Sequence, residues 1–138
     1  MSKKNPSVFI SSTFEDLAEY RNAVRDAVVR AGAMPILFED QPASGQPVEE
    51  RIKELLDRSD AVLLLVGHRY GSVDSKTGTS WIEAEYNAAR RRAKPLLAFL
   101  AAEDAPWPPK FIDPNRTRIA EFRQRHCCPA ISRTESIG

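Results

Sequence analysis

The sequence predicts one α/β domain over residues 1–138, with an open parallel sheet of about five strands and helices on both faces. Short apolar segments alternate with segments of helical periodicity along the chain, as in consecutive strand–helix–strand units. The clearest strand, DAVLLLV at residues 60–66, is continuously apolar, as expected for a strand buried on both faces of a parallel sheet. For about five such strands, the flavodoxin-like order 2-1-3-4-5 is the natural arrangement.

The first part of the chain is predicted to form a strand, a helix and a second strand. Residues 7–11 (SVFIS) are short, apolar and rich in β-branched and aromatic side chains. The capping box Ser12-x-x-Glu15 predicts a helix start, and Gly32 predicts its end. Residues 34–38 (MPILF) form the second predicted strand. The apolar positions of the helix are Leu17, Val24, Val28 and Ala31.

The middle of the chain repeats this alternation. Residues 40–47 (DQPASGQP) are a loop dense in Pro, Gly and Ser, and a short amphipathic helix follows. After the strand at residues 60–66, residues 67–79 (GHRYGSVDSKTGT) form a loop and residues 80–92 a helix. The apolar positions of the short helix are Val48, Ile52, Leu55 and Leu56.

The last part is predicted to hold the two remaining strands. Residues 95–100 (PLLAFL) form the fourth strand, and a proline-rich loop follows at residues 101–114. Residues 115–125 are predicted as a helix and residues 127–131 as a weak fifth strand. A doubly wound sheet usually adds one more helix, which the short polar end ISRTESIG does not supply. We therefore expect a fragment, reliance on a partner, or a partly bare sheet face.

Composition and charge narrow the class of protein. The 42% hydrophobic and 28% charged residues fit a soluble globular chain. The formal net charge of +1 favours neither nucleic acid nor an anionic membrane as a partner. The start has no apolar run typical of a signal peptide, and the longest apolar run, residues 61–66, is too short to cross a bilayer. Cys127 and Cys128 are adjacent, without spacing typical of a metal site, so we expect reduced thiols in a cytoplasmic protein.

The fold predicts where a ligand would bind. In an open parallel sheet, ligands bind beyond the carboxyl ends of the strands, where the strand order reverses. Here that point lies between the first and third strands. The segments expected to meet there are Ser11, Ser12 and Thr13, the loop from Asp40, the loop from Gly67, and the start of the helix at residues 80–92.

Two carboxylates near this point, in TSWIEAEY, call for different interpretations. Glu83 completes a capping box with Ser80, which is a sufficient structural role. Glu85 has no such role: it borders the predicted buried stripe and shares a face with Trp81, four residues earlier. An acid beside an aromatic wall near a cleft suits catalysis or ribose binding, whereas the alternative is a solvated helix glutamate. The predicted buried stripe is Ile82, Tyr86, Ala89 and Ala93.

Four segments, VFISSTFEDLAEYR, GHRYG, SWIEAEYNAA and KPLLAFL, together resemble the domain of unknown function 4062 family. That family is regarded as related to TIR domains, which share the flavodoxin-like fold. In enzymatic TIR domains, a glutamate four residues after a tryptophan on the helix following the third strand is catalytic. Trp81 and Glu85 match this spacing.

The resemblance implies cleavage of the nicotinamide–ribose bond of NAD⁺, in bacterial defence or signalling, with NAD⁺ as substrate and neither cofactor nor metal. Glu85 would stabilise the oxocarbenium-like cation and Trp81 would shape the pocket. The resemblance also implies a homo-oligomer assembled through residues 40–47. The remaining candidate substrate-binding residues are Ser11, Ser12 and Thr13 for the pyrophosphate, and Gly67, Tyr70 and Gly71 in the following loop.

Several alternatives stay open. The chain lacks G-x-G-x-x-G, so it is not an ordinary dinucleotide-binding domain. A non-catalytic module that binds a nucleotide or a protein is the second hypothesis, and a nucleoside deoxyribosyltransferase is the third. Gly67 and Gly71 also suit turns that need positive φ, and Tyr70 suits a packed loop anchor. Arg21 is predicted to pair with Asp16 or Glu19, with phosphate binding as the alternative.

Overall fold

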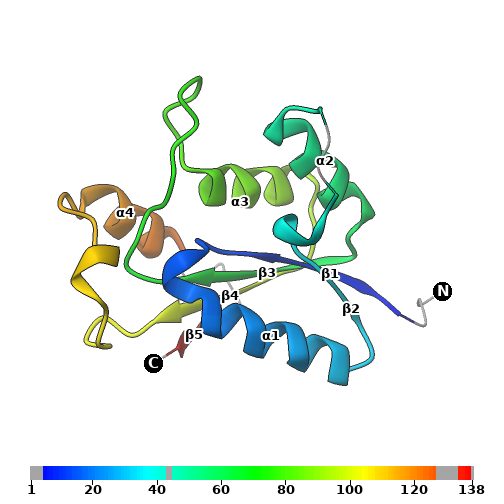
Figure 1. Ribbon diagram of the computed structural model, residues 1–138, viewed down its shortest axis with the longest axis horizontal. Coiled ribbons are helices and arrows are strands. Elements are labelled where there is room, and N and C mark those ends of the chain that lie inside the picture. The colour runs from blue at the N-terminus through cyan, green and yellow to red at the C-terminus, as the bar shows by residue number, and fades with distance from the viewer. Residues whose placement is uncertain (1–4, 43–44, 127–133, 138) are drawn as a thin grey trace.

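The computed structural model describes residues 5–42, 45–126 and 134–137. Its centre is a five-stranded sheet in the order β2-β1-β3-β4-β5, and every neighbouring pair is parallel (Figure 1). The predicted fold class and strand order are therefore confirmed. The strands are β1 (Ser7–Ser11), β2 (Met34–Ile36), β3 (Ala61–Val66), β4 (Leu96–Ala101) and β5 (Thr134–Ile137).

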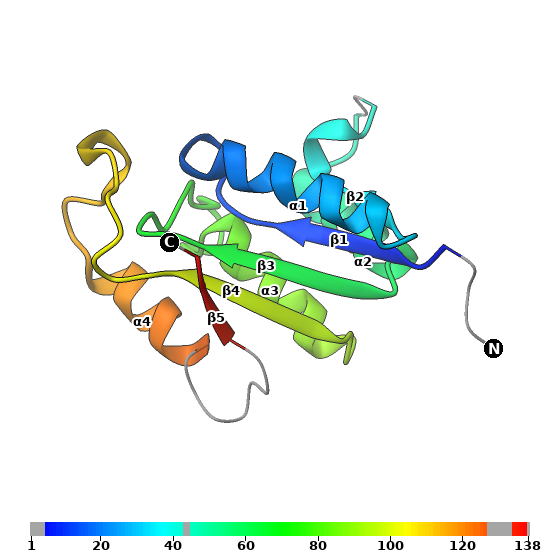
Figure 2. The ribbon, with the colours of Figure 1, turned by 90° about the horizontal axis from the view of Figure 1, so that it is seen from below.

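Helices cover both faces of this sheet. Figures 1 and 2 show α1 on one face and α2 and α3 on the opposite face, with α4 beside α3. The helices are α1 (Ala18–Arg30), α2 (Val48–Arg58), α3 (Trp81–Arg91) and α4 (Thr117–His126). Three short 3-10 turns complete the described elements: η1 (Glu15–Leu17), η2 (Phe38–Asp40) and η3 (Pro109–Phe111).

The continuous apolar run of β3 is explained by helices on both faces. Leu64 and Val66 belong to a buried cluster with α3 and α4, whereas Leu65 belongs to the cluster beneath α1. On β1, Phe9 packs with α2 and α3, and the next residue, Ile10, packs with α1. Successive side chains of a strand point to opposite faces, so a central strand needs apolar residues at every position.

Several predicted details differ from the structure. The predicted strand at residues 34–38 ends at Ile36, because the chain turns into η2 beside the sheet edge. The helix predicted from residue 80 takes Ser80 as its N-cap and ends at Arg91. Ala93, predicted to be buried, is exposed beyond that end with a φ of 52°.

The fifth strand also differs from the prediction. Residues 127–131 lie outside the described part of the chain. The strand that pairs with β4 is Thr134–Ile137, in the polar end of the chain that was predicted only to be too short for a further helix. An edge strand is held through backbone hydrogen bonds on one side, so it can form from a segment without an apolar run.

Candidate functional site

A cleft of about 310 Å³ lies at the carboxyl ends of β1 and β3, where the order of strands reverses. The cleft therefore lies where the sequence predicts a ligand-binding site. Its volume lies at the lower end of the range of about 300–1,000 Å³ typical of small-molecule sites. Five sequence-predicted residues line it: Ser12, Thr13, Gly71, Trp81 and Glu85.

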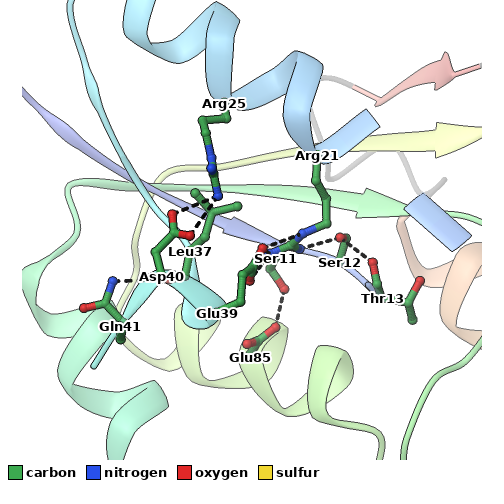
Figure 3. Close-up of polar contacts among 10 residues, drawn as sticks. All are labelled: Ser11, Ser12, Thr13, Arg21, Arg25, Leu37, Glu39, Asp40, Gln41 and Glu85. Atoms are coloured by element: carbon green, nitrogen blue, oxygen red, sulfur yellow. Dashed lines mark hydrogen bonds and ion pairs between the residues drawn. The ribbon is translucent and has the colours of Figure 1, made fainter. Parts of the chain in front are cut away.

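Glu85 lies at the base of this cleft. It comes from the second turn of α3, and only 8% of its surface is exposed. The hydroxyl of Ser11, the last residue of β1, donates a 2.6 Å hydrogen bond to Glu85 Oε1 (Figure 3). Ser11 does not line the cleft but supports the carboxylate from behind, since it is itself buried. The alternative of a solvated helix glutamate is therefore wrong.

Burial raises the pKa of the Glu85 carboxyl from 4.5 to about 7. The hydrogen bond from Ser11 and the positive charge of Arg21 act in the opposite direction, and the negative charge of Glu39 adds to the rise. At neutral pH the acid and its carboxylate are therefore present in comparable amounts. A ligand with positive charge near Glu85 would shift this balance toward the carboxylate.

An apolar wall faces this acid. Trp81 lines the cleft one helical turn before Glu85 and packs against the cluster shared by α2, α3 and β1. Phe38 and Ile52 continue the wall. Phe14 lies at the mouth, with 56% of its surface exposed. The cleft thus combines one buried acid with a surface suited to a flat, weakly polar ring.

The first loop contributes two hydroxyls to the cleft, and both are already hydrogen-bonded. Ser12 Oγ donates to the carbonyl of Thr13 at 2.7 Å and accepts from Arg21 Nη1 at 2.6 Å. Thr13 Oγ1 donates to Asp16 Oδ1 at 2.5 Å, while burial raises the pKa of Asp16. The capping box predicted for Ser12 and Glu15 is not formed, because the Ser12 hydroxyl is used elsewhere and η1 precedes the α-helix.

Arg21 forms an ion pair, as predicted, but with a different partner. Its guanidinium binds Glu39, with contacts of 2.5, 2.6 and 3.1 Å, rather than Asp16 or Glu19. Glu39 lies on η2, 18 residues later, and only the fold brings it to α1 (Figure 3). Both residues line the cleft.

Three charged residues of the cleft were not predicted as site residues: Glu15, Glu39 and Arg69. Arg69 stands inside the GHRYG segment, and its position in the loop that follows β3 was a usable signal. Its guanidinium lies 5.9 Å from the centre of the Phe111 ring. Within the described part of the chain it makes no hydrogen bond or ion pair, and its positive charge acts to lower the pKa of Asp16. No local pattern marked Glu39.

Besides Ser11, two predicted binding residues, Gly67 and Tyr70, lie outside the cleft. Tyr70 is 5% exposed, with its ring packed edge-on against Phe122 at 6.5 Å. Its side chain is therefore the loop anchor, because the core cluster of α3 and α4 encloses it. Gly67 faces Trp107: a Cβ at this glycine would lie 2.4 Å from Trp107 Cζ2. Close approach of the indole explains why this position needs glycine.

Gly71 does line the cleft, and its backbone needs glycine for two reasons. Its φ is 91°, a value that other residues rarely adopt, and a Cβ there would lie 2.8 Å from Thr13 Cγ2. The loop after β3 is thereby held against the loop after β1. The two loops in contact here both line the cleft.

The capping box predicted at the start of α3 is half formed. Ser80 Oγ accepts from the backbone N–H of Glu83 at 3.2 Å, as an N-cap does. The Glu83 carboxylate, however, accepts from the Tyr70 hydroxyl and from Arg125 instead of the Ser80 backbone. Tyr70 takes that place, since its hydroxyl oxygen accepts from Ser80 N at 3.2 Å. Glu83 therefore has a structural role, as predicted, with different partners.

The described residues contain neither a group of metal ligands nor a membrane-spanning helix. In that part of the chain, no three His, Cys, Asp or Glu side chains are grouped as a metal ion would require. Within residues 5–42, 45–126 and 134–137, every helix is too short or too polar to span a lipid bilayer.

Comparison with known proteins agrees with this architecture. The TIR domains of the activated Roq1 resistosome, which directly recognises the pathogen effector XopQ, superpose with a TM-score of 0.59 at 12% identity, over 88% of this chain and 70% of that one. A prokaryotic SEFIR domain superposes with a TM-score of 0.53 at 19% identity, over 88% of this chain and 95% of that one. At these identities the likeness concerns the fold. No curated protein matches the chain.

The sequence itself matches one family model across most of its length. Residues 7–128 match the family described as "Domain of unknown function (DUF4062)". This span includes β1 to β4 and every residue of the cleft. The chain therefore belongs to the DUF4062 family and has a TIR-like fold.

Proposed function

We propose that this protein cleaves the nicotinamide–ribose bond of NAD⁺ or a related nucleotide, with Glu85 as the catalytic residue. The observation that carries the proposal is the buried carboxyl of Glu85 at the base of a cleft, beside Trp81 and hydrogen-bonded by Ser11. The remaining structural features support a ligand with a flat ring, a ribose and phosphate groups.

The chemistry suits a single carboxylate. When the bond between the nicotinamide nitrogen and ribose C1′ breaks, its electron pair leaves with nicotinamide, and positive charge develops on the ribose. Nicotinamide is a neutral leaving group, so no acid has to protonate it. The Glu85 carboxylate stabilises the ribose cation more than the ground state and thereby lowers the barrier. Water then adds to C1′ and releases a proton, which gives ADP-ribose.

The size and lining of the cleft support this substrate class. About 310 Å³ suits a nucleoside-sized fragment rather than a whole dinucleotide. Trp81 and Phe38 offer apolar surface to the nicotinamide, and the rest of the nucleotide would extend past Phe14 at the mouth. Arg21 and Arg69 supply positive charge for phosphate groups.

We further propose that the chain acts in defence or signalling and assembles into homo-oligomers. One structural neighbour is a TIR domain within a resistosome, which motivates the proposal. Residues 40–47 would provide the assembly contact. This loop runs between η2 and α2, whose residues Glu39 and Val48 line the cleft, so an assembly contact there would lie next to the site.

The test is whether the purified protein releases nicotinamide from NAD⁺, with and without a crowding agent in the reaction. Chromatography measures the nicotinamide that is released. We expect release by the wild type and loss of at least about 100-fold in Glu85→Gln, the scale of removing one group that stabilises transition-state charge. Glu83→Gln, two residues away, serves as the control and keeps its turnover. Binding of NAD⁺ without release would contradict the enzymatic proposal and favour a nucleotide-binding module. Exchange of nicotinamide for a free purine would favour a transferase.

A further inference from the structure

One feature of the cleft is not explained by cleavage chemistry: a buried cation whose counter-ion lies at the rim. Arg21 is 5% exposed, although charged side chains are rarely buried without a partner. Its guanidinium is held on two sides, by Ser12 Oγ and by both oxygens of Glu39. This fork-like pairing with two oxygens is the geometry with which arginine also binds phosphate.

Glu39 is an exchangeable partner for this arginine. Its side chain is 33% exposed, so its carboxylate can be hydrated when it leaves. It is carried by η2, a three-residue turn, rather than by a long helix or an inner strand. Arg21 cannot be hydrated in the same way, because an unpaired guanidinium in this position would carry a large desolvation cost. Glu39 can therefore leave readily only when another anion replaces it.

The surroundings favour phosphate as that anion. Ser12 lines the cleft beside Arg21, and its hydroxyl already contacts the guanidinium. Arg69 lines the same cleft from the loop after β3 and makes no hydrogen bond or ion pair within the described residues. A phosphate group has more acceptor oxygens than a carboxylate and can accept hydrogen bonds from more than one guanidinium group.

We propose that Arg21 and Ser12 form an anion subsite for a nucleotide phosphate, which Glu39 occupies until the ligand displaces it. The inference rests on the proposed function for the identity of the nucleotide, but the subsite itself does not depend on catalysis. In the free protein the Glu39 carboxylate then acts as an internal competitor of the substrate. Removing that carboxylate strengthens binding of a phosphate-bearing ligand, whereas removing the guanidinium weakens it.

Calorimetric titration with inorganic pyrophosphate tests the subsite without ribose or chemistry. We expect Glu39→Gln to lower the Kd for pyrophosphate by about fivefold or more, and Arg21→Gln to raise it by about tenfold or more, a scale set by one charge-assisted contact. Asp57→Asn is the matched control, because it removes a carboxylate from an ion pair with Arg92 outside the cleft. Its Kd should stay within about twofold of the wild-type value.

The same variants separate this inference from the proposed enzyme activity. If Glu39→Gln binds pyrophosphate no better than the wild type, the displacement idea is wrong, whatever happens to NAD⁺. This holds even if Arg21→Gln fails to fold. If pyrophosphate binding responds as expected but no nicotinamide is released, the subsite stands and the cleavage proposal fails. Ligand-induced thermal stabilisation should be larger in Glu39→Gln than in the wild type, because the ligand then supplies the missing counter-ion.

Discussion

The hydroxyl of Ser11 donates a 2.6 Å hydrogen bond to the carboxyl of Glu85, joining the end of β1 to α3 across 74 residues of sequence. Both side chains are buried, at 1% and 8% exposure. The bond holds the acid at the base of the cleft and favours its ionised form. The position and the ionisation of Glu85 therefore depend on a residue that does not line the cleft.

Replacing Ser11 by alanine should shift the pH dependence of nicotinamide release. Loss of a hydrogen bond to the carboxylate raises the pKa of Glu85 further above about 7, so less carboxylate is present at neutral pH. We expect release by Ser11→Ala to fall about 2- to 5-fold at pH 7, the effect of a rise of about one pKa unit or less, and to recover toward the wild-type rate near pH 9.

The control for this prediction is another buried serine. Ser59 donates to the carbonyl of Leu55 at 2.6 Å, away from the cleft. Ser59→Ala should lower stability without moving the pH profile. A profile for Ser11→Ala that coincides with the wild-type profile would show that the hydrogen bond does not control the ionisation of Glu85.

Burial of Glu85 also makes folding stability depend on pH. The folded protein binds the proton of the Glu85 carboxyl more tightly than the unfolded chain does, because the pKa is about 7 in the folded protein and 4.5 in the unfolded chain. The stability that this proton contributes is present below about pH 4.5 and is lost as the pH rises through about 7. From pH 5 to pH 8, the free energy of unfolding of the wild type relative to Glu85→Gln should fall by on the order of 2–3 kcal/mol. Urea denaturation at both pH values measures this difference, and a constant difference would contradict it.

The contact between Gly71 and Thr13 should be visible in mutant stability. Gly71→Ala adds a methyl group 2.8 Å from Thr13 Cγ2 at a backbone φ of 91°. We expect a loss of about 1–3 kcal/mol in the free energy of unfolding. Thr13→Ser removes the clashing methyl group, so the double variant should recover part of the loss, with a coupling of about 0.5 kcal/mol or more.

Gly45→Ala is the reference substitution for this pair. A Cβ at Gly45 meets no atom within 4 Å, and its backbone does not have a positive φ. The free energy of unfolding of Gly45→Ala should therefore stay within about 0.5 kcal/mol of the wild-type value. If Gly71→Ala and Gly45→Ala cost the same, close packing of the two loops is not what requires glycine at position 71.

The fold could be predicted because its strands are unusually apolar. Residues 61–66 and 96–100 are apolar runs buried between helices, so the sequence alone indicates strands and a parallel sheet. β5 was misplaced because Thr134–Ile137 is polar at an edge, where backbone pairing suffices. The length of β2, which is also an edge strand, was overestimated. The apolar run at residues 34–38 does not show that the chain leaves the sheet after Ile36.

The site could be predicted only in part. Glu85 was recognisable because local helix chemistry accounted for Glu83 and left the second acid unexplained. The ion pair of Arg21 with Glu39 joins residues 18 positions apart, on α1 and η2, and no local pattern indicates that contact. Tyr70 was misassigned because an aromatic residue in a loop next to a cleft can point into the core as readily as into the cleft.

The most direct test of the central claim compares chemistry with binding in one variant, Glu85→Gln. If Glu85 stabilises the ribose cation, nicotinamide release from NAD⁺ at pH 7.5 should fall by at least about 100-fold. The Kd for NAD⁺, measured by calorimetry, should change by less than about fivefold, because the carboxylate acts mainly in the transition state. Release by Glu85→Gln at the wild-type rate would contradict the assignment of Glu85 as the catalytic residue.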